Sequence, residues 1–473
     1  MEFDKDLQAV QQARALARQA EEAQKALAQY SQQKLDAIVQ AVAKAFAGVA
    51  AELAELAVRE TGFGNVTDKI TKNEFASRQV LAAIENMTCV GVLNENAREK
   101  LWEIGVPVGV IAAIVPSTNP TSTVCYKALI ALKSGNSIVF SPHPKAIACT
   151  MRAAEIVKKA AEAAGAPAGS VGCLSIPSMA GCKELMEAKE TKLILATGGP
   201  AMVKAAYSSG KPAIGVGAGN GPVYIHHSAD VEKALSCILQ SKTFDYGTVC
   251  ASEQSIVIEA PMEQKVKEIA AKMGFYFMNK DEAGCLAKLL FKPNGTLNPE
   301  IVGRPATDLA EKAGFSVPAS TRVLVAREQE AGPTRPYSME KLCPVLAFFV
   351  MENEDAVLAK AIEVLIHEGS GHTFAMHAED REVIRKFALQ IPVSRFLVNT
   401  PAALGGIGAT TGLFPALTLG CGAVGGSSSS NNISPMDLIN IRRVAWGKED
   451  VKKPDAEADL VEILTAKILE RLK

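Results

Sequence analysis

The sequence predicts an α/β protein in which two domains each carry a doubly wound parallel sheet. Short, nearly unbroken apolar runs rich in β-branched residues, such as IGVPVGVIAAIVP from residue 104 and NSIVF from residue 136, are typical of strands buried on both faces. Helical stretches alternate with these runs, and such alternation favours parallel sheets. At 473 residues the chain is too long for one small core, so two domains are expected.

Composition and charge exclude several classes of protein. A net charge of −1 suggests neither a nucleic-acid-binding nor a membrane-surface protein, and 48% hydrophobic with 21% charged residues is typical of a globular chain. No apolar run approaches the roughly 20 residues that span a bilayer, and the start MEFDKDLQAV is not typical of a secretory signal. The ten cysteines are scattered without CxxC pairs, which favours reduced thiols in a cytoplasmic protein over disulfides or a metal site.

The pattern of apolar and polar residues divides the chain into four parts. Residues 1–244 begin with two or three amphipathic helices, stopped by Gly62, and continue with alternating strands and helices. Residues 245–425 form a second α/β block. Residues 426–449 hold the strand INIRRVAWG, and residues 450–473 hold a charged linker and a last helix. The helices expected in the first block cover 125–133, 146–164 and 181–188, with another from Pro200.

The last helix, DLVEILTAKILERLK, is amphipathic. Its apolar face is formed by Leu460, Ile463, Leu464, Ile468 and Leu472. A short helix beyond a polar linker is not needed to complete a core. It is either a docking peptide or a helix folded back on its own protomer, and the residues leave both interpretations open.

Two glycine-containing stretches could approach phosphate groups. In IGVGAGNGPVYI, strand-like residues lie on both sides of the glycines, whereas a dinucleotide fingerprint needs a helix after them. A tight strand–turn–strand connection is therefore favoured there. KLILATGGPAMVK is typical of a strand, the turn Thr197-Gly198-Gly199 and a helix opened by Pro200, where free amides could receive a pyrophosphate.

Two side chains are candidates for chemistry. Asn119 stands between a buried strand and a helix, so its side chain would either cap the helix, which the residues alone favour, or point an amide N–H into a site as an oxyanion donor. Cys250 follows a glycine-containing turn in FDYGTVCASEQ, and a buried structural thiol is the ordinary interpretation of any cysteine. Neither motif carries an assignment alone.

Taken together, the motifs indicate a protein family far more specifically than any one of them does alone. In order and spacing the chain resembles the aldehyde dehydrogenase family over residues 5–447, and above all its CoA-acylating branch. The stretches that carry the resemblance are KNEFAS, IVPSTNPTST, FSPHPKA, TGGPAMV, GVGAGNGP, FDYGTVCASEQ, EKLCPVLAFF, GSGHTFAMH and TLGCGAVGGSSSSNNISPMDLINIRRVA. The resemblance implies an aldehyde dehydrogenase-like fold, with residues 1–244 as the NAD-binding domain, 245–425 as the catalytic domain and 426–449 as a β arm for oligomerisation.

The resemblance also implies roles for individual residues. Cys250 falls on the family's nucleophile, Asn119 on the side-chain half of its oxyanion hole, and Glu340 on the glutamate that holds the nicotinamide ribose. The further cofactor contacts fall on Thr197, Gly198 and Gly199, and on Ser141, Pro142 and His143, where many relatives have Lys-Pro-Ser. NAD is the expected cofactor, because no basic residue begins that last stretch to meet a 2′-phosphate.

The chain departs from hydrolytic relatives at Val216 and Gly217, which we also assign to the cofactor-binding face. Those relatives have Glu-Leu-Gly-Gly where this chain has VGAG, and the glutamate is the base that activates water. Valine cannot take a proton, so hydrolysis would lose a factor of about 10²–10⁴. A thiol such as CoA needs less help, because it ionises at about pH 8.5. The missing acid therefore indicates an acyl group handed from Cys250 to CoA.

The residue that takes the proton from Cys250 is not settled by the sequence. His372 in GHT matches a histidine that acylating relatives place near the site, but a structural hydrogen bond at a strand start is equally favoured. Glu253 begins a strand and is expected to be structural. Three other cysteines are expected to be core or lining residues: Cys125, Cys237 and Cys343.

The expected activity is the reversible, NAD-dependent oxidation of a short aldehyde, acetaldehyde first and propionaldehyde next, to an acyl-CoA. An acyl-phosphate reductase of the same fold and a non-catalytic assembly component are the alternatives, and the intact Cys250, Asn119 and Glu340 argue against the second. The resemblance further implies a homodimer or larger homo-oligomer. Residues 459–473 are similar in kind to peptides that dock enzymes to shell or cargo proteins of bacterial microcompartments.

Overall fold

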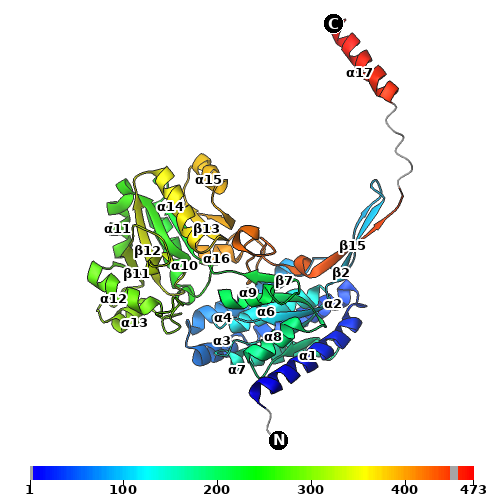
Figure 1. Cartoon of the computed structure of the whole chain (residues 1–473), viewed down its shortest axis with the longest axis horizontal. Helices are drawn as coiled ribbons and strands as arrows, with labels where there is room; N and C mark the ends of the chain where they lie inside the picture. Colours follow the sequence, from blue (N-terminus) through cyan, green and yellow to red (C-terminus); the bar gives the residue numbers. More distant parts are fainter. Residues whose placement is uncertain (1–3, 448–455, 473) are drawn as a thin grey trace.

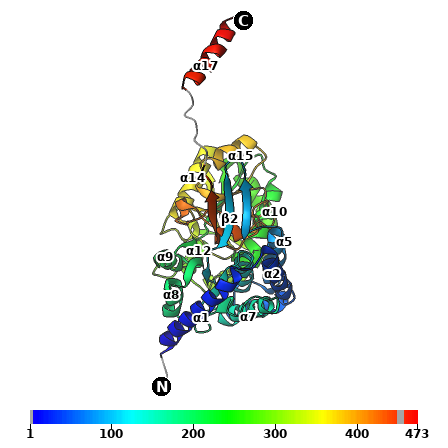
Figure 2. The same ribbon diagram turned by 90° about the vertical axis from the view of Figure 1, so that its right-hand side faces the viewer.

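The computed structural model describes residues 4–447 and 456–472, which form two parallel sheets and one antiparallel sheet (Figure 1). The first parallel sheet has the order β5-β4-β3-β6-β7, and the second has the order β10-β11-β12-β9-β8-β13-β14. The antiparallel sheet, β1-β2-β15, stands out from the first domain as an arm (Figures 1 and 2). The predicted class, two parallel α/β domains with a β arm, is confirmed.

The strands fall into the three sheets as follows. The first parallel sheet consists of β3 (Val110–Ile114), β4 (Ser137–Ser141), β5 (Val171–Cys173), β6 (Thr191–Thr197) and β7 (Ala213–Val216). The second consists of β8 (Gly221–Ile225), β9 (Glu253–Glu259), β10 (Phe275–Phe277), β11 (Val323–Arg327), β12 (Val345–Met351), β13 (Gly371–His377) and β14 (Val393–Val398). The arm consists of β1 (Gly91–Asn96), β2 (Leu101–Pro107) and β15 (Ile439–Ala445).

Helices cover the faces of both parallel sheets. In the first domain they are α1 (Lys5–Leu27), α2 (Gln32–Ala47), α3 (Ala50–Thr61), α4 (Val66–Glu74), α5 (Val80–Ile84), α6 (Pro120–Lys133), α7 (Ile147–Ala163), α8 (Met179–Glu187) and α9 (Pro200–Tyr207). In the second they are α10 (Val231–Thr243), α11 (Glu263–Lys272), α12 (Lys280–Leu290), α13 (Ala306–Ala313), α14 (Glu354–His367), α15 (Arg381–Ala388) and α16 (Ala402–Gly406). Among the described residues no single helix is long and apolar enough to cross a membrane; α2 and α3 reach that length only as a bent pair.

The sheets are buried on both faces, as the unbroken apolar runs predict. In β3, Ile111 and Ala113 pack into one hydrophobic cluster, whereas Ala112 and Ile114 pack into another on the opposite face. Strand β12 alternates in the same way between the two clusters of the second domain. Because successive side chains of a strand point to opposite faces, such a sheet needs helices on both sides.

Helix α6 is buried along its whole length. It begins at Pro120, earlier than the predicted 125–133, because a proline in the first turn needs no hydrogen-bond acceptor for a backbone N–H. The stretch CYKALIALK holds the apolar pattern, but PTSTV before it contains a proline and three hydroxyl residues and therefore gives no helical signal. This extension places the helix start directly after Asn119.

The chain crosses between the two domains at residues 217–220. Strand β7 ends at Val216 in the first sheet, and β8 begins at Gly221 in the second, so the two strands do not pair. Strands lie on both sides of the glycines, as predicted, with residues 217–220 between them, but the two strands belong to different sheets. The second sheet also begins before the predicted boundary at residue 245, because β8 pairs in parallel with β9 and β13.

The arm is formed by segments far apart in the sequence. Strand β15 pairs antiparallel along β2, from Ile439 opposite Pro107 to Ala445 opposite Leu101. The final helix, α17 (Ala456–Arg471), is drawn apart from both domains (Figure 1). Its exposed apolar side chains include those of Ile463, Leu464, Ile468 and Leu472. The predicted linker falls largely on residues 448–455, outside the described residues, as does the side chain of Leu460.

Candidate active site

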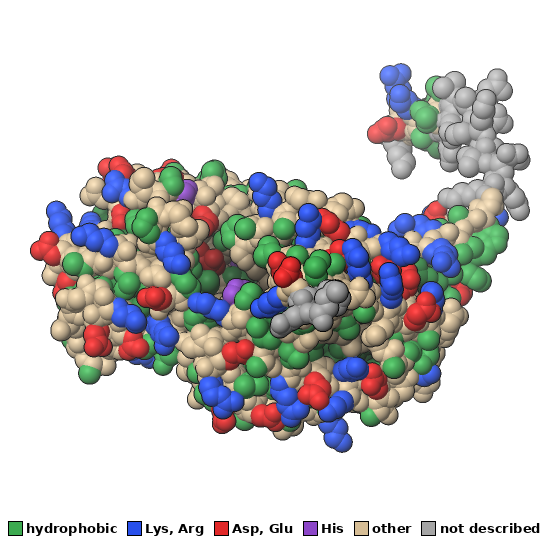
Figure 3. Space-filling model, turned by 60° about the horizontal axis from the view of Figure 1, so that its bottom comes forward, with side chains coloured by type: hydrophobic (Ala, Val, Ile, Leu, Met, Phe, Trp, Pro, Cys, Tyr) green, Lys and Arg blue, Asp and Glu red, His purple; other side chains and the backbone are tan. Residues whose placement is uncertain are grey.

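A cavity of about 230 Å³ lies where loops of the two domains meet. Figure 3 shows the surface hollowed between the two domains. The predicted site residues that line this cavity are Asn119, His143, Thr197, Gly198, Gly199, Val216, Gly217, Cys250 and Glu340. Three predicted residues do not line it: Ser141, Pro142 and His372.

The topology of the sheets explains why these loops converge. In the first sheet β3 and β6 are neighbours, and the chain winds outward in opposite directions from them, through β4 and β5 on one side and β7 on the other. The crevice at the carboxyl ends of two such strands is the usual ligand site of a doubly wound sheet. The loops 116–119 and 197–199 leave these two ends, and Cys250 faces them from the loop before β9.

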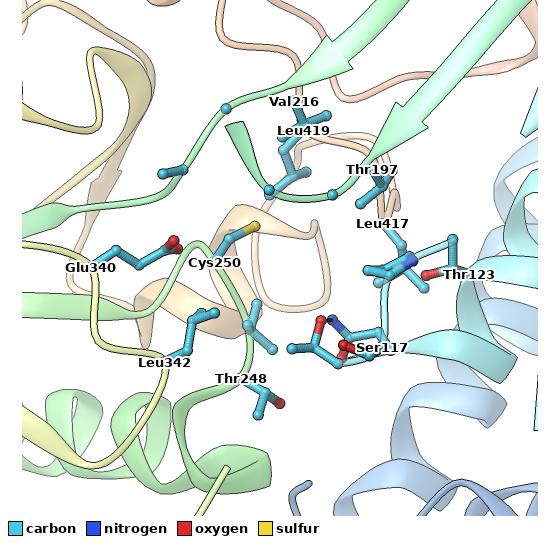
Figure 4. Close-up of a pocket in the computed structure, with 18 of the residues that line it drawn as sticks. Ser117, Thr123, Thr197, Val216, Thr248, Cys250, Glu340, Leu342, Leu417 and Leu419 are labelled. Carbon is cyan, nitrogen blue, oxygen red and sulfur yellow. Dashed lines mark hydrogen bonds between the residues drawn. The ribbon is translucent and has the colours of Figure 1, made fainter. Parts of the chain in front are cut away.

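Cys250 points its thiol into the cavity between Glu340 and Val216 (Figure 4). All ten cysteines lie within the described residues, and Cys250 alone lines this cavity. Burial, together with the nearby Glu340 carboxylate, raises the pKa of the Cys250 thiol to about 12, while Arg395 and the residue's own backbone N–H act in the opposite direction. At neutral pH the thiol is therefore protonated in this structure.

The crossing segment, residues 217–220, contacts Cys250 directly. A Cβ on Gly219 would lie 1.8 Å from the carbonyl oxygen of Cys250, so only glycine allows this approach. The Gly219 N–H donates to Oε1 of Glu340 over 2.9 Å. Burial, with Glu368 nearby, raises the pKa of Glu340 to about 8. The glycines of VGAG thus bring a carboxyl group and the nucleophile to the same wall.

Asn119 does not cap helix α6, contrary to the interpretation that the residues alone favour. Its side chain makes no capping hydrogen bond. Instead, its Oδ1 accepts from Nζ of Lys72 over 2.6 Å, and its Nδ2 donates to Oγ1 of Thr118 over 3.1 Å. Because an amide nitrogen carries two hydrogens, one N–H of Asn119 has no partner among the described residues. That N–H is available at the cavity wall as an oxyanion donor.

A buried group of three charged side chains stands behind Asn119. Oδ2 of Asp245 accepts from Nζ of Lys69 over 2.8 Å and from Nζ of Lys72 over 2.5 Å. Asp245 and Tyr246 both have left-handed backbone conformations, with φ of 48° and 52°, which is uncommon for non-glycine residues. The loop that leads to Cys250 is therefore held in an unusual conformation by this group.

Sequence reasoning missed Lys69, Lys72 and Asp245. Both lysines are less than 4% exposed, and Asp245 is fully buried. The sequence gives little indication that the two lysines are buried. KITKNEFAS contains two lysines three residues apart, a spacing that is common on exposed helices. Only the pairing with a carboxylate about 170 residues away, which the sequence pattern does not encode, makes their burial possible.

Comparison with known proteins agrees with this geometry. The sequence profile of the aldehyde dehydrogenase family matches residues 6–280. The chain belongs to the aldehyde dehydrogenase family. It is 44% identical over 442 residues to the bifunctional aldehyde–alcohol dehydrogenase of Escherichia coli K12, which covers 92% of this chain and 50% of that protein. The chain thus spans about half the length of this relative.

Solved structures of aldehyde dehydrogenases share the fold. An acetylating aldehyde dehydrogenase from Geobacillus thermoglucosidasius is 48% identical, with a TM-score of 0.93 and coverage of 96% of this chain and 100% of that one. A propionaldehyde dehydrogenase from the fucose utilisation microcompartment of Clostridium phytofermentans is 28% identical, with a TM-score of 0.83 and coverage of 95% and 99%. The similarity extends over both domains and the arm.

The residues around Thr197 fit a dinucleotide. The buried Oγ1 of Thr197 lines the cavity and has no hydrogen-bond partner. A Cβ on Gly199 would meet nothing within 4 Å, so there is open space over the start of α9. Free amides and the positive end of the helix dipole favour a pyrophosphate at such a start. Ser141 and Pro142 are buried beside the end of β4, whereas His143 is exposed.

Two candidate bases do not line the cavity. His372 is fully buried in β13, where its Nδ1 contacts Oγ1 of Thr373 over 2.8 Å, and burial followed by the charge of Arg395 lowers its pKa well below the ordinary value. Glu253 is also buried, and its Oε1 accepts from the backbone N–H of Ala402 over 3.0 Å. The structural interpretation of Glu253 agrees with these contacts, and neither His372 nor Glu253 lines the cavity.

Proposed function

We propose that this aldehyde dehydrogenase is CoA-acylating and oxidises a short aldehyde with NAD⁺ and CoA to an acyl-CoA through a thioester on Cys250. The observation that carries the proposal is the identity of the side chains on the two sides of the Cys250 thiol. One wall offers Val216, which cannot accept a proton; the other offers Glu340, whose Oε1 already accepts from Gly219. Val216 therefore leaves this position without the carboxylate that hydrolytic relatives use to activate water.

The chain's own residues account for formation of the thioester. The thiolate of Cys250 attacks the aldehyde carbon, and the resulting oxyanion accepts from the free N–H of Asn119 and from the backbone N–H of Cys250. The turn 197–199 and Glu340 would hold NAD⁺, which would supply the hydride acceptor. The acyl group then stays on Cys250 until the thiol of CoA attacks it and releases acyl-CoA. Each step is reversible, so acyl-CoA can also be reduced.

The charge of the cavity favours a small uncharged aldehyde. Leu417 and Leu419 contribute apolar lining (Figure 4). Ile407 also lines the cavity. Lys72 is the only Lys or Arg among the lining residues, and its three N–H donors are occupied by Asn119, Asp245 and Thr248. An aldehyde that carries a carboxylate or sulfonate would find no free cation here. Acetaldehyde is the first expectation and propionaldehyde the second.

The test measures NADH formation from acetaldehyde and NAD⁺ with CoA, with phosphate and with neither. NADH and acetyl-CoA are expected only in the presence of CoA, with the product identified by mass spectrometry. Acetyl phosphate formed without CoA would favour the acyl-phosphate reductase. Turnover with neither acceptor would contradict the argument from Val216. Repeating the assay with NADP⁺ tests cofactor choice, because Ser141, and no basic residue, begins the stretch 141–143 that would meet a 2′-phosphate.

The arm and the final helix support a proposal about assembly. Trp102 and Trp446 of the arm are partly exposed, with ring centroids 4.9 Å apart, and Ile441 is also exposed. We propose that this face joins copies of the chain into a homodimer or larger oligomer. The exposed apolar face of α17, and the microcompartment source of the C. phytofermentans relative, support docking to a microcompartment shell or cargo protein. Deleting residues 450–473 should abolish encapsulation and leave turnover and oligomeric state unchanged.

A further inference from the structure

Lys72 makes three hydrogen bonds inside the protein. Its Nζ donates to Oδ1 of Asn119 over 2.6 Å, to Oδ2 of Asp245 over 2.5 Å and to Oγ1 of Thr248 over 3.0 Å. An ammonium group has three hydrogens and no acceptor, so each is used. Two of the three partners, Asn119 and Thr248, line the cavity of Cys250. A lysine that serves only to neutralise Asp245 would not need either.

The ammonium group determines which way the amide of Asn119 faces. Because Nζ can only donate, the atom 2.6 Å away must be the amide oxygen, and the amide nitrogen must occupy the other position. Rotating the amide by 180° would set two donors against each other. The same contact withdraws electron density from the amide, which strengthens the hydrogen bond that its N–H donates. Lys72 therefore acts on both the direction and the strength of the oxyanion donor.

The helix that carries Lys72 is fastened to the start of α6. Next to it, Nδ2 of Asn73 donates to the backbone oxygen of Ala50, and Oδ1 of Asn73 accepts from Oγ1 of Thr121 over 2.8 Å. A π-helical turn, Phe75–Gln79, follows directly, and such turns are frequent at functional sites. The motif KNEFAS thus holds two consecutive side chains that each contact one residue of the Asn119–Thr121 segment.

We propose that Lys72 is a positioning residue that holds the Asn119 amide with its N–H toward the reacting carbonyl at Cys250. This proposal rests on the proposed function only for the identity of the physiological substrate. Any acyl transfer to Cys250 passes through the same oxyanion, so the role of Lys72 can be tested with other substrates. Lys69 is the matched comparison: it pairs with the same Asp245 oxygen but donates its second hydrogen bond to the backbone oxygen of Thr118. It therefore shares the charge network without contacting the Asn119 side chain.

The test compares Lys72→Met with Lys69→Met in the full chain. Each variant leaves Asp245 paired with one lysine, so we expect similar losses of thermal stability. Lys72→Met should lower kcat about 10- to 100-fold, below the 10²–10³-fold that removal of an oxyanion donor costs. Lys69→Met should lower kcat less than about fivefold. Neither should change the Kd of NADH or the rate at which iodoacetamide alkylates Cys250, which does not pass through an oxyanion. Equal losses of kcat in the two variants would overturn the proposal.

A double-mutant cycle with Asn119→Ala gives the sharper readout. If Lys72 acts through Asn119, adding Lys72→Met to Asn119→Ala should cost less than about threefold, whereas independent effects would multiply. Multiplication would overturn the proposal. Should Lys72→Met fail to fold, Asn119→Asp takes its place: it keeps an acceptor for Lys72 and loses the donor, so it should be more stable than Asn119→Ala yet equally inactive. An Asn119→Asp protein no more stable than Asn119→Ala would contradict the contact.

A second reaction separates this proposal from the proposed function. p-Nitrophenyl acetate acylates a cysteine thiolate with release of p-nitrophenolate and needs neither NAD⁺ nor CoA. The ratio of wild-type to Lys72→Met rates should be similar in this reaction and in NADH formation. A wild-type protein that releases p-nitrophenolate but forms no NADH from any short aldehyde would refute the proposed function, and the ester rates would still decide the role of Lys72.

Discussion

The two sides of the cavity are built very differently. On one side, Asn119 is held by a hydrogen bond to Lys72, behind which Asp245 is paired twice. On the other side, the Cys250 thiol lies in surroundings that raise its pKa to about 12. In the proposed mechanism, the oxyanion donor Asn119 is therefore held in place in advance, whereas the proposed nucleophile Cys250 is kept protonated. A positive charge beside Cys250, such as an oxidised nicotinamide ring, would lower that pKa.

The largest effect is expected from removing the nucleophile. Cys250→Ala should reduce NADH formation below detection, because no other cysteine lines the cavity within the described residues. NADH binding, measured by fluorescence titration, should remain within about twofold of wild type, since the turn 197–199 and Glu340 are untouched. Turnover that survives in Cys250→Ala would show that another residue is the nucleophile. The comparison between the Asn119 side and the Cys250 side of the cavity would then lose its basis.

The next largest effect concerns the preorganised side. Asn119→Ala should lower kcat by about 10²–10³ with a smaller change in KM, because an oxyanion donor acts mainly in the transition state. Single-turnover measurement of NADH formation isolates the step. Thr123→Val, which changes a side chain at the same wall without altering the amide, is the control. A loss below tenfold in Asn119→Ala would show that the backbone N–H of Cys250 suffices.

A third prediction tests the protonated side through pH. Below its pKa a thiol gains thiolate about tenfold per pH unit, so without ligands the alkylation of Cys250 by iodoacetamide should still rise at pH 10, whereas an ordinary thiol with a pKa of about 8.5 levels off. The exposed Cys285 serves as the internal reference when both peptides are followed by mass spectrometry. Saturating NAD⁺ should accelerate Cys250 more than NADH does. A plateau near pH 8 without ligand would contradict the raised pKa.

What the sequence predicts well are features written in local pattern. The apolar runs predict β3, β6 and β9, and the order of the strands places the loop of Asn119 beside the turn 197–199. The motifs identify Cys250 because the family resemblance adds their order and spacing to the individual signals. Nine of the predicted site residues consequently meet in one cavity.

What escaped prediction depends on partners distant in sequence. The pattern around GVGAGNGP shows strands on both sides but not that β7 and β8 join different sheets. The N-terminal position of Asn119 suggests a cap, and only the approach of Lys72 shows where the oxygen points. Buried lysines are rare, so no pattern of residues predicts Lys69 or Lys72 inside the protein without Asp245 in view.

The smallest effect is expected from substituting Glu253. If this carboxylate were the base for Cys250, the thiol would have a preorganised partner, as Asn119 has in Lys72. It does not line the cavity, and its Oε1 accepts from the backbone N–H of Ala402. Burial raises its pKa to about 7, so near neutral pH it is partly protonated and Gln is a close replacement for the neutral form. Glu253→Gln should therefore change kcat less than about threefold.

Stability provides the second measurement for Glu253→Gln. A carboxyl group whose pKa is raised on folding stabilises the native state below the unfolded pKa of about 4.3, and this contribution is lost as pH rises through about 7. Gln has no proton to lose, so the stability of the variant relative to wild type should increase as pH rises from about 4.3 to about 7 and level off above that, as measured by thermal unfolding. A kcat loss above 100-fold without that pH trend would contradict this prediction. It would indicate that Glu253 is the base that deprotonates Cys250.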